Sequence, residues 1–328
     1  MKHLLEVVNL QTAFQSEKSE IIAVDEISFT LNAGETLGIV GESGCGKSIT
    51  SLSIIGLLGK KGRVKKGNIY FDNEDLAQTS ESDFRKIRGN QISMIFQEPM
   101  TSLNPVFTIG NQMIEGIKLH MKLSTKEARS YAIEMLEKVR IPRAEEVMKE
   151  YPHVLSGGMR QRVVIAMALA CKPKLLIADE PTTALDVTIQ AQILELMRNL
   201  KEESETAIMF ITHDLGVIAE MADKVIVMYA GQIVEEADVF TLFKNPKHPY
   251  TQGLMASIPH IEYEEEERLS SIPGTVPTPQ NMPKGCRFHT RCPYVTEQCK
   301  QERPDLFQIN DTHKSRCWLV KTEKHNKE

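Results

Sequence analysis

A glycine-rich segment between an apolar run and a helical pattern constrains this chain more than any other feature. Residues 41–48 read Gly-Glu-Ser-Gly-Cys-Gly-Lys-Ser and match the pattern G-x-x-x-x-G-K-[ST]. Thr36–Val40 precedes the segment as an expected strand, and Lys47–Leu58 follows it as an expected helix. Glycines in such a turn let backbone N–H groups point at phosphate oxygens, and the helix N-terminus adds its dipole. The segment therefore predicts a site for nucleotide phosphates.

Two side chains of this segment have expected roles in holding ATP and Mg²⁺. Lys47 would reach the β- and γ-phosphates, and Ser48 would bind the Mg²⁺ ion. Cys45 lies at a variable position of the motif and receives no chemical role. The residues expected around the nucleotide are Gly41, Glu42, Ser43, Gly44, Cys45, Gly46, Lys47, Ser48 and Ile49.

Short apolar runs alternate with helical patterns through most of the sequence. Further runs of this kind are Ile92–Phe96, Leu175–Ala178, Ala207–Thr212 and Val225–Tyr229. Continuous apolar runs separated by helices are typical of a parallel sheet that is covered on both faces. Ala230-Gly231 separates the last run from Ile233-Val234 and predicts a hairpin. The pattern predicts an α/β fold.

Two parts of the chain depart from this alternation. No strand pattern occurs from about Gly110 to Leu155, and a capping box at Ser124–Glu127 begins a helical spacing there. After His248 the alternation stops, and a charge run at 262–267 and four prolines predict an extended linker. We therefore expect a nucleotide-binding domain over residues 1–250, with a helical subdomain at about 85–160. Residues 251–328 form a separate extension.

Composition excludes several classes of protein. A chain of 328 residues suggests roughly two domains, and its net charge of −5 gives no support for a nucleic-acid partner. The longest apolar run, Val163–Cys171, has nine residues, whereas a spanning helix needs about 20. Glu6 interrupts any signal-peptide core. We therefore expect a chain that is neither exported nor itself integral to a membrane, with its six cysteines as thiols.

Two further segments carry groups that suit phosphate chemistry. The run Leu175–Ala178 ends in Asp179-Glu180, where Asp179 can hold the Mg²⁺ shell and Glu180 can orient or deprotonate a water. Ser156 has the character of a helix N-cap, and Gly157 and Gly158 leave backbone N–H groups open to an anion. From spacing alone, an ordinary capped helix explains the second segment equally well.

Taken in order, these motifs resemble an ATP-binding-cassette (ABC) ATPase over about residues 4–250. Thr212-His213-Asp214 follows the other motifs, Gln97 resembles the glutamine of the family's Q-loop, and residues 184–186 resemble its D-loop. The resemblance implies a P-loop NTPase core of the RecA-like type with an antiparallel β subdomain and a helical signature subdomain. The segment Leu155-Ser-Gly-Gly-Met159 resembles the signature motif of the family, but it ends in methionine rather than glutamine, and Arg160-Gln161-Arg162 follows. That departure resembles the D-type ATPase subunit of oligopeptide and dipeptide importers.

The resemblance also implies roles and partners. A second ATPase chain, a paralogue or another copy, would pair with this one, and each ATP would lie between the P-loop of one chain and the equivalent of Ser156, Gly157 and Gly158 in the other. His213 would contact the γ-phosphate and hold the attacking water with Glu180, Lys47 would stabilise the transition state, and Gln97 would couple the site to two transmembrane permease subunits. Residues Ser48, Gln97 and Asp179 would surround Mg²⁺, Asp186 belongs to the D-loop, and Phe14 is our prediction for the adenine-stacking ring.

Four cysteines near the C-terminus form a second constellation, Cys286-x5-Cys292-x6-Cys299-x17-Cys317. Clustered thiols suggest a metal, but zinc sites usually contain a pair separated by two to four residues. Spacing alone leaves an iron–sulfur cluster, a zinc site and free thiols equally open. The stretch His248-Pro-Tyr-Thr251 and the cysteines that follow it resemble the C-terminal extension of peptide-importer ATPases. This resemblance favours a small irregular, metal-binding extension that holds a [4Fe–4S] cluster.

The resulting prediction is an ATP-hydrolysing subunit of a bacterial oligopeptide importer. It would lie at the cytoplasmic face of the cell membrane as a peripheral protein, and an extracytoplasmic peptide-binding protein would serve the same transporter. Dipeptides, nickel chelates and glutathione are the alternative substrates. A soluble ABC ATPase of DNA repair or translation, and a non-catalytic regulatory subunit, are the alternative functions.

Overall fold

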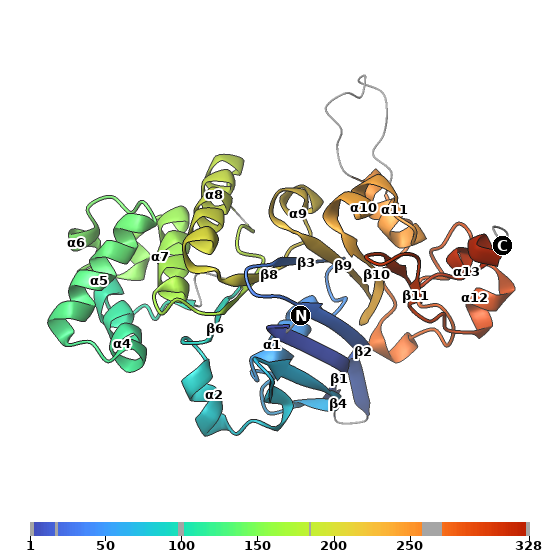
Figure 1. Ribbon diagram of the computed structural model, residues 1–328, viewed down its shortest axis with the longest axis horizontal. Coiled ribbons are helices and arrows are strands. Elements are labelled where there is room, and N and C mark those ends of the chain that lie inside the picture. The colour runs from blue at the N-terminus through green and yellow to red at the C-terminus, as the bar shows by residue number, and fades with distance from the viewer. Residues whose placement is uncertain (1–2, 17–18, 98–101, 184, 258–270, 326–328) are drawn as a thin grey trace, which may run out of the picture. The chain divides into compact units, whose positions relative to one another are not determined.

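The computed structural model describes residues 3–16, 19–97, 102–183, 185–257 and 271–325 (Figure 1). The contacts divide these residues into two compact units. Unit 1 comprises residues 31–35 and 78–211, and unit 2 comprises residues 3–30, 36–77 and 212–328. The expected charge run at 262–267 and Ala184 of the expected D-loop lie outside the described residues.

Unit 1 contains three parallel strands, which confirms the expected parallel pairing. β7 (Leu175–Asp179) lies between β6 (Ile92–Ile95) and β8 (Ala207–Ile211), and all three run in the same direction. All residues of β7 and β8 are buried, as their continuous apolar sequences predict. The carboxyl end of β7 thus brings Asp179 to the edge of a buried sheet.

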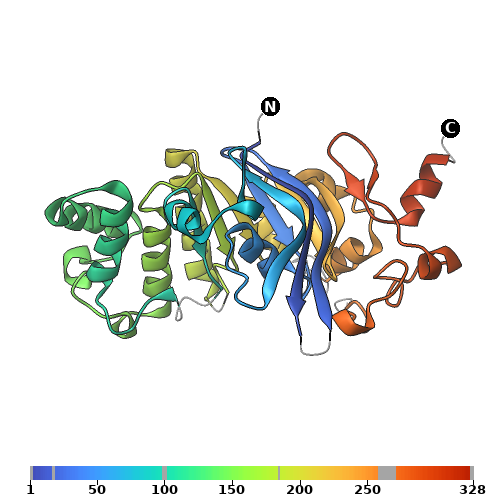
Figure 2. The ribbon, with the colours of Figure 1, turned by 90° about the horizontal axis from the view of Figure 1, so that it is seen from below.

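Helices account for most of the rest of unit 1, and several of them gather as the green segments of Figure 2. The strand-free middle of the sequence forms helices, as predicted, and Ser124 and Glu127 make the expected reciprocal capping box. The helices are α2 (Glu81–Ile87), α4 (Ile109–Met121), α5 (Thr125–Lys138), α6 (Ala144–Val147), α7 (Gly157–Leu169) and α8 (Val187–Ser204), with a 3₁₀ turn at Pro152–Val154.

Unit 2 contains strands of two sheets. One sheet has the order β2-β1-β4-β5, from β1 (Leu5–Gln15), β2 (Glu20–Leu31), β4 (Gly62–Phe71) and β5 (Glu74–Asp75), and β1 pairs antiparallel with β4. The other sheet includes β3 (Thr36–Val40), which pairs parallel with β9 (Lys224–Tyr229). β10 (Gln232–Asp238) returns antiparallel beside β9 and confirms the predicted hairpin.

The expected helix after the glycine-rich segment is shorter than its sequence predicts. α1 covers Lys47–Ile54 rather than extending to Leu58. Gly56 has a φ of 68°, a left-handed conformation that ends a helix and that glycine adopts without steric cost. The other helices in this part of the chain are α9 (Leu215–Met221), α10 (Val239–Lys244) and α11 (Pro249–Ala256), the last of which runs across residue 251, and a 3₁₀ turn covers Leu76–Gln78.

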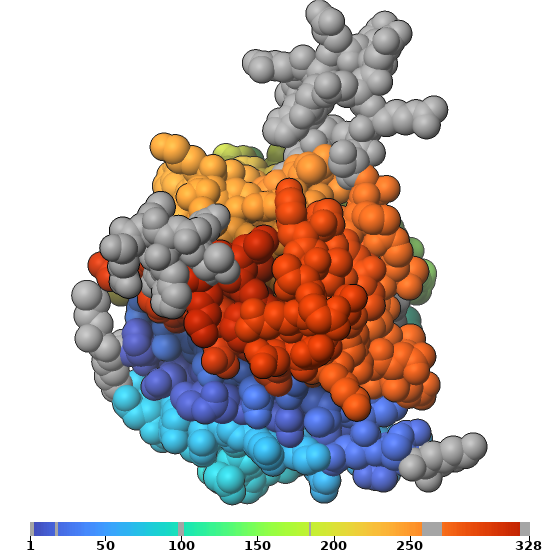
Figure 3. Space-filling model, turned by 90° about the vertical axis from the view of Figure 1, so that its right-hand side faces the viewer, coloured from blue at the N-terminus to red at the C-terminus, as the bar shows by residue number. Residues whose placement is uncertain are grey.

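The C-terminal extension is irregular, as expected, and lies beside the N-terminal strands of the same unit in Figure 3. Its elements are short: a 3₁₀ turn at Pro279–Asn281, α12 (Glu297–Gln301), β11 (Phe307–Gln308), β12 (Lys314–Ser315) and α13 (Trp318–His325). β12 adds to the edge of β10, and Arg287 and Arg303 pair with Asp25 of β2. Among the described helices, none combines the length and apolar character that crossing a bilayer requires.

Candidate functional site

The expected phosphate-binding loop joins β3 to α1 within unit 2. Gly41 and Gly46 have φ angles of 153° and 104°, which favour glycine at both positions. A Cβ atom on Gly41 would lie 2.2 Å from the carbonyl oxygen of Met228 in β9, and one on Gly46 would lie 3.0 Å from the carbonyl oxygen of Ala23. The loop is therefore packed so closely against its own unit that only glycine fits at these positions.

The charges and amides of this loop suit a polyphosphate. The Lys47 ammonium is buried and donates hydrogen bonds to the carbonyl oxygens of Gly41 at 2.6 Å and Glu42 at 3.1 Å. Within the described part of the chain, no side chain caps α1, whose N-cap is Gly46, and Ser43 and Gly44 of the loop are exposed. An uncapped helix N-terminus beside a lysine and an exposed backbone is the donor set that phosphate oxygens require. Ser48, the expected Mg²⁺ ligand, is half-buried in the first turn of α1.

In unit 1, the structure brings together Asp179, Glu180 and Gln97. Asp179 is the buried last residue of β7, and Glu180 follows it with a φ of 48°. The Glu180 carboxylate accepts hydrogen bonds from Gln97 Nε2 at 3.0 Å and from Thr183 Oγ1 at 2.9 Å. A left-handed glutamate costs conformational energy, and such strain concentrates at functional sites. The side chain is thus held in one orientation at the end of the strand.

The expected signature segment forms the exposed start of α7. Ser156 is the N-cap of this helix and accepts a hydrogen bond from Met159 N–H at 3.3 Å. A Cβ atom on Gly157 would meet nothing within 4 Å, whereas one on Gly158 would lie 3.0 Å from Ile189. The helix N-terminus therefore presents its amides without side-chain cover at Gly157. Gln161 lies further along α7 and donates to the carbonyl oxygen of Pro181 at 2.6 Å, which ties this helix to the segment after Glu180.

The other predicted residues lie at element ends. Asp186 is the N-cap of α8 and accepts from Ile189 N–H at 3.0 Å. His213 is exposed in the turn before α9, and the adjacent Asp214 caps that helix. Phe14 lies half-buried in β1, where its ring covers Gly62 of β4. Whether Phe14 stacks on adenine stays a prediction.

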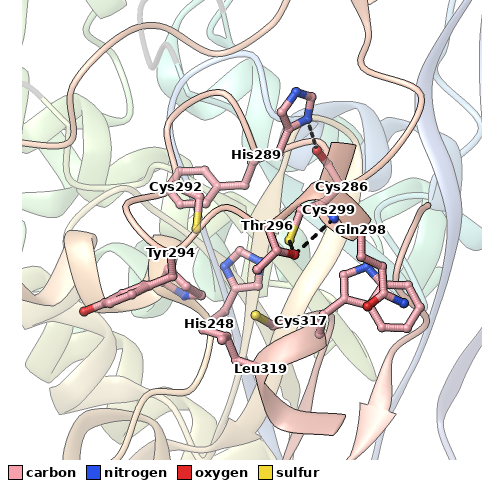
Figure 4. A pocket seen from close by; sticks show the side chains of 13 residues that line it. His248, Cys286, His289, Cys292, Tyr294, Thr296, Gln298, Cys299, Cys317 and Leu319 are labelled. Atoms are coloured by element: carbon pink, nitrogen blue, oxygen red, sulfur yellow. Dashed lines mark hydrogen bonds between the residues drawn. The ribbon is translucent and has the colours of Figure 1, made fainter. Parts of the chain in front are cut away.

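The four cysteines of the extension line a single pocket of about 90 Å³ together with His248, Phe288 and Trp318 (Figure 4). Burial raises the pKa of Cys286 to about 11 and that of Cys317 to about 12, so these thiols are protonated near neutral pH. Among the described residues, no three histidine, cysteine or acidic side chains are arranged to hold a metal ion. The prediction of a metal-binding extension is therefore not supported. The physical reason is that the described cysteines line the walls of a pocket, and no three of them form a group that could hold one ion.

The sequence assigned no role to four further residues of these sites, although Gln161 and Tyr250 lie in stretches that carry the family resemblance. Thr183 and Gln161 act through single hydrogen bonds to Glu180 and Pro181, which leave no pattern in the sequence. Tyr250 and Arg291 both contact Glu42 of the phosphate-binding loop, from 208 and 249 positions away. For Tyr250 and Arg291, the sequence offers only the His-Pro-Tyr-Thr stretch around Tyr250 and the position of Arg291 beside Cys292.

The similarity of this chain to known proteins agrees with this geometry. The family model described as "ABC transporter" matches residues 24–183, which include the phosphate-binding loop and Glu180. A dimeric ATP-binding cassette solved in a post-hydrolysis state with ADP and phosphate is similar at a TM-score of 0.65 and 30% identity, covering 72% of this chain and 98% of that one. A subunit of an ABC transporter complex from Clostridium perfringens is similar at a TM-score of 0.63 and 27% identity, covering 75% of this chain and 92% of that one. The fold and the site define an ABC-type ATPase.

The C-terminal part of the chain and two of its relatives narrow this class. The model "Oligopeptide/dipeptide transporter, C-terminal region" matches residues 234–299. The oligopeptide transport ATP-binding protein AppD of Bacillus subtilis is 57% identical, covering 98% of each chain. The dipeptide transport ATP-binding protein DppD of Escherichia coli is 50% identical, covering 96% of each chain. The chain belongs to the family of oligopeptide and dipeptide transport ATP-binding proteins.

Proposed function

We propose that this chain hydrolyses ATP to drive the import of oligopeptides through a membrane transporter. The observation that carries the hydrolytic part is the Glu180 carboxylate, held by Gln97 and Thr183 at the end of β7. In this orientation the carboxylate can accept a proton from a water that attacks the γ-phosphate. Bound Mg²⁺ would neutralise phosphate charge, with Ser48 and Asp179 as its protein ligands and Gln97 beside it. Lys47 would bind the β- and γ-phosphates, and His213 would hold the attacking water.

A second ATPase chain completes the proposed site. The chain carries helix N-termini suited to phosphate at α1 and at α7, but its sequence contains one phosphate-binding loop. We propose that Ser156, Gly157 and Gly158 serve the nucleotide of a partner ATPase, either a related subunit or another copy. Two permease subunits would dock on the same pair of ATPases at the cytoplasmic face of the membrane. An extracytoplasmic peptide-binding protein would deliver the substrate.

The choice of oligopeptides follows the names of the relatives. The most similar of those given above is an oligopeptide transport protein, and the dipeptide transport protein is less similar, at 57% against 50% identity. Uptake of a labelled pentapeptide and a labelled dipeptide by cells that lack this chain tests this choice. Restored pentapeptide uptake with the wild-type chain supports the proposal. Restored uptake of the dipeptide alone makes the chain a dipeptide importer subunit.

Replacing Glu180 by glutamine tests the hydrolytic part. The amide keeps the size of the side chain and its bond to Thr183, but it cannot take a proton. We expect the rate of ATP hydrolysis by the assembled transporter to fall by about 10²- to 10⁴-fold, because a positioned general base contributes that much. ATP binding should be retained. Wild-type turnover in this variant would remove Glu180 from the mechanism.

A second proposal concerns the extension: its four cysteines together bind a [4Fe–4S] cluster and not a single metal ion. The support is that Cys286, Cys292, Cys299 and Cys317 all line one pocket. A cluster accepts thiolates spread around its volume, whereas zinc needs four ligands that converge on one ion. The cluster would have a structural or redox-sensing role, because ATP hydrolysis needs no electrons. We propose that this extension begins at residue 251.

Elemental analysis of protein purified without oxygen tests the second proposal. About four irons and four acid-labile sulfides per chain, lost when Cys299 is replaced by serine, are the expected result. Cys171→Ser is the matched control, because Cys171 lies outside the extension at the end of α7. One zinc without sulfide, or no metal, would refute the cluster and leave the ATPase proposal intact.

A further inference from the structure

The phosphate-binding loop is held in place by a residue of the C-terminal extension. Arg291 donates from Nη1 to both carboxylate oxygens of Glu42, each at 3.0 Å. The side chain of Arg291 is 4% exposed and that of Glu42 is 29% exposed, so water screens this pair only in part. An ion pair in such a setting holds its two groups more firmly than one on an open surface.

The guanidinium of Arg291 is itself fixed on the side away from the loop. Its Nε donates to the carbonyl oxygen of Pro273 at 2.9 Å, and its Nη2 donates to that of Ile272 at 3.2 Å. The rings of Tyr229 and Phe288 lie beneath it, with centroids 5.8 and 6.0 Å from the guanidinium carbon. Arg291 therefore presents Glu42 with a donor that is already oriented before any nucleotide arrives.

Tyr250 binds the backbone of the same loop residue, Glu42. Its hydroxyl accepts a hydrogen bond from Glu42 N–H at 2.8 Å, and the side chain is fully buried. The Tyr250 ring packs on those of Tyr229 and Phe288, at centroid distances of 4.7 and 5.4 Å. Burial raises the pKa of Tyr250 far above its usual value, so the hydroxyl stays neutral.

All the polar groups of Glu42 are thus in use. Its N–H donates to Tyr250, its carboxylate accepts from Arg291, and its carbonyl oxygen accepts from the Lys47 ammonium at 3.1 Å. The third bond connects Glu42, and through it Arg291 and Tyr250, to the lysine that is expected to bind the β- and γ-phosphates. Fixing a glycine-rich loop beforehand lowers the conformational entropy lost when a ligand binds.

We propose that Arg291 and Tyr250 are positioning residues of the phosphate-binding loop, and that through Arg291 the C-terminal extension sets the nucleotide affinity of this subunit. The inference rests on the nucleotide site proposed for residues 41–48. It goes beyond that site, because it assigns a function in nucleotide binding to a part of the chain that carries none of the ATPase motifs.

A purely structural role for the pair of Arg291 and Glu42 is a weaker explanation, because other polar contacts join the extension to the rest of unit 2. Asp25 pairs with Arg287 and Arg303, Glu235 binds His313, and Glu236 pairs with Lys314. Each of these joins the extension to a strand and does so without Glu42. Docking of the extension therefore does not depend on the pair between Arg291 and Glu42 alone.

Titration of the full-length chain with MgADP tests the proposal. Glu42→Gln and Arg291→Gln should each raise the dissociation constant by about 5- to 30-fold, within the usual range for coupled sites. The double variant should be no weaker than either single variant, because the two residues act as a unit. Tyr250→Phe should weaken binding in the same direction. The matched control is Lys314→Gln, which removes a charge of the extension that pairs away from the loop and should leave the dissociation constant unchanged.

The outcomes separate this inference from the nucleotide site on which it rests. If the wild-type chain does not bind MgADP, the proposed nucleotide site fails and the inference fails with it. If the wild-type chain binds MgADP and Glu42→Gln binds it equally well, only the inference is overturned. Additive losses in the double variant would also overturn it. If Arg291→Gln does not fold, Glu42→Gln and Tyr250→Phe decide, since a loop carboxylate and a hydroxyl are smaller losses to the fold.

Discussion

Gln97 donates a hydrogen bond from Nε2 to the Oε2 atom of Glu180 at 3.0 Å, and thereby joins the segment after β6 to the end of β7. Thr183 Oγ1 donates to the same oxygen at 2.9 Å. The carboxylate is therefore oriented by two neutral donors, which fix its position and leave its charge intact. A general base needs this combination, because it must reach one water and still accept a proton.

Replacing Gln97 by alanine should lower the rate of ATP hydrolysis by roughly fivefold, because Glu180 loses an orienting hydrogen bond worth about 1 kcal/mol. The melting temperature should change little, since Gln97 is exposed. Hydrolysis by the assembled transporter and thermal unfolding of the purified chain are the two measurements. Gln78→Ala, at the end of a 3₁₀ turn, is a matched control. A large fall in melting temperature with unchanged turnover would contradict this role.

Replacing Lys47 by alanine should weaken MgADP binding by about 10- to 100-fold, because charge-assisted hydrogen bonds to phosphate contribute about 1.5–3 kcal/mol. The folded chain should keep its stability, since the buried ammonium donates to groups of its own loop, the carbonyl oxygens of Gly41 and Glu42 and the Cys45 sulfur. Lys66→Ala removes the same charge from an exposed position of β4 and should bind MgADP as the wild-type chain does. Equal affinities for all three chains would exclude the proposed phosphate site.

The two ATPase motifs were predictable because each is contiguous in the sequence. Residues 41–48 lie between a buried strand and a helix, and residues 179–180 end another buried strand, so local patterns place the groups. The length of α1 was mispredicted, because the apolar pattern continues to Leu58 while Gly56 adopts a left-handed conformation. The periodic spacing of apolar residues does not show where a glycine ends a helix.

The contacts of Glu42 could not be predicted in the same way. Arg291 reaches it from 249 positions away, and neither residue belongs to a periodic pattern that would indicate the pairing. The cysteines show a similar limit, because spacing left a cluster, zinc and free thiols open. The structure adds that all four thiols line one pocket. Such long-range relationships depend on the packing of the extension on unit 2, which a single sequence does not state.

The stability of the chain should fall in mild acid because of His248. Burial lowers the pKa of His248 from 6.5 to about 4, an effect that Glu235 partly opposes and Arg316 reinforces. Between pH 6.5 and 4 the unfolded chain binds a proton that the folded chain does not, so the free energy of unfolding decreases as the pH falls. The full loss below pH 4 is on the order of 3 kcal/mol, since one pKa unit corresponds to about 1.4 kcal/mol.

Urea unfolding of the metal-free chain at pH 7.5 and pH 5 measures this loss. His248 Nδ1 accepts a hydrogen bond from Tyr250 N–H at 3.1 Å as the N-cap of α11. In His248→Asn the side chain can still cap the helix but no longer titrates, so the variant should lose less stability between the two pH values than the wild-type chain. His153→Asn removes an exposed histidine and should follow the wild-type profile. An equal loss in all three chains would assign the acid sensitivity to other groups, because only His248→Asn removes a buried neutral imidazole.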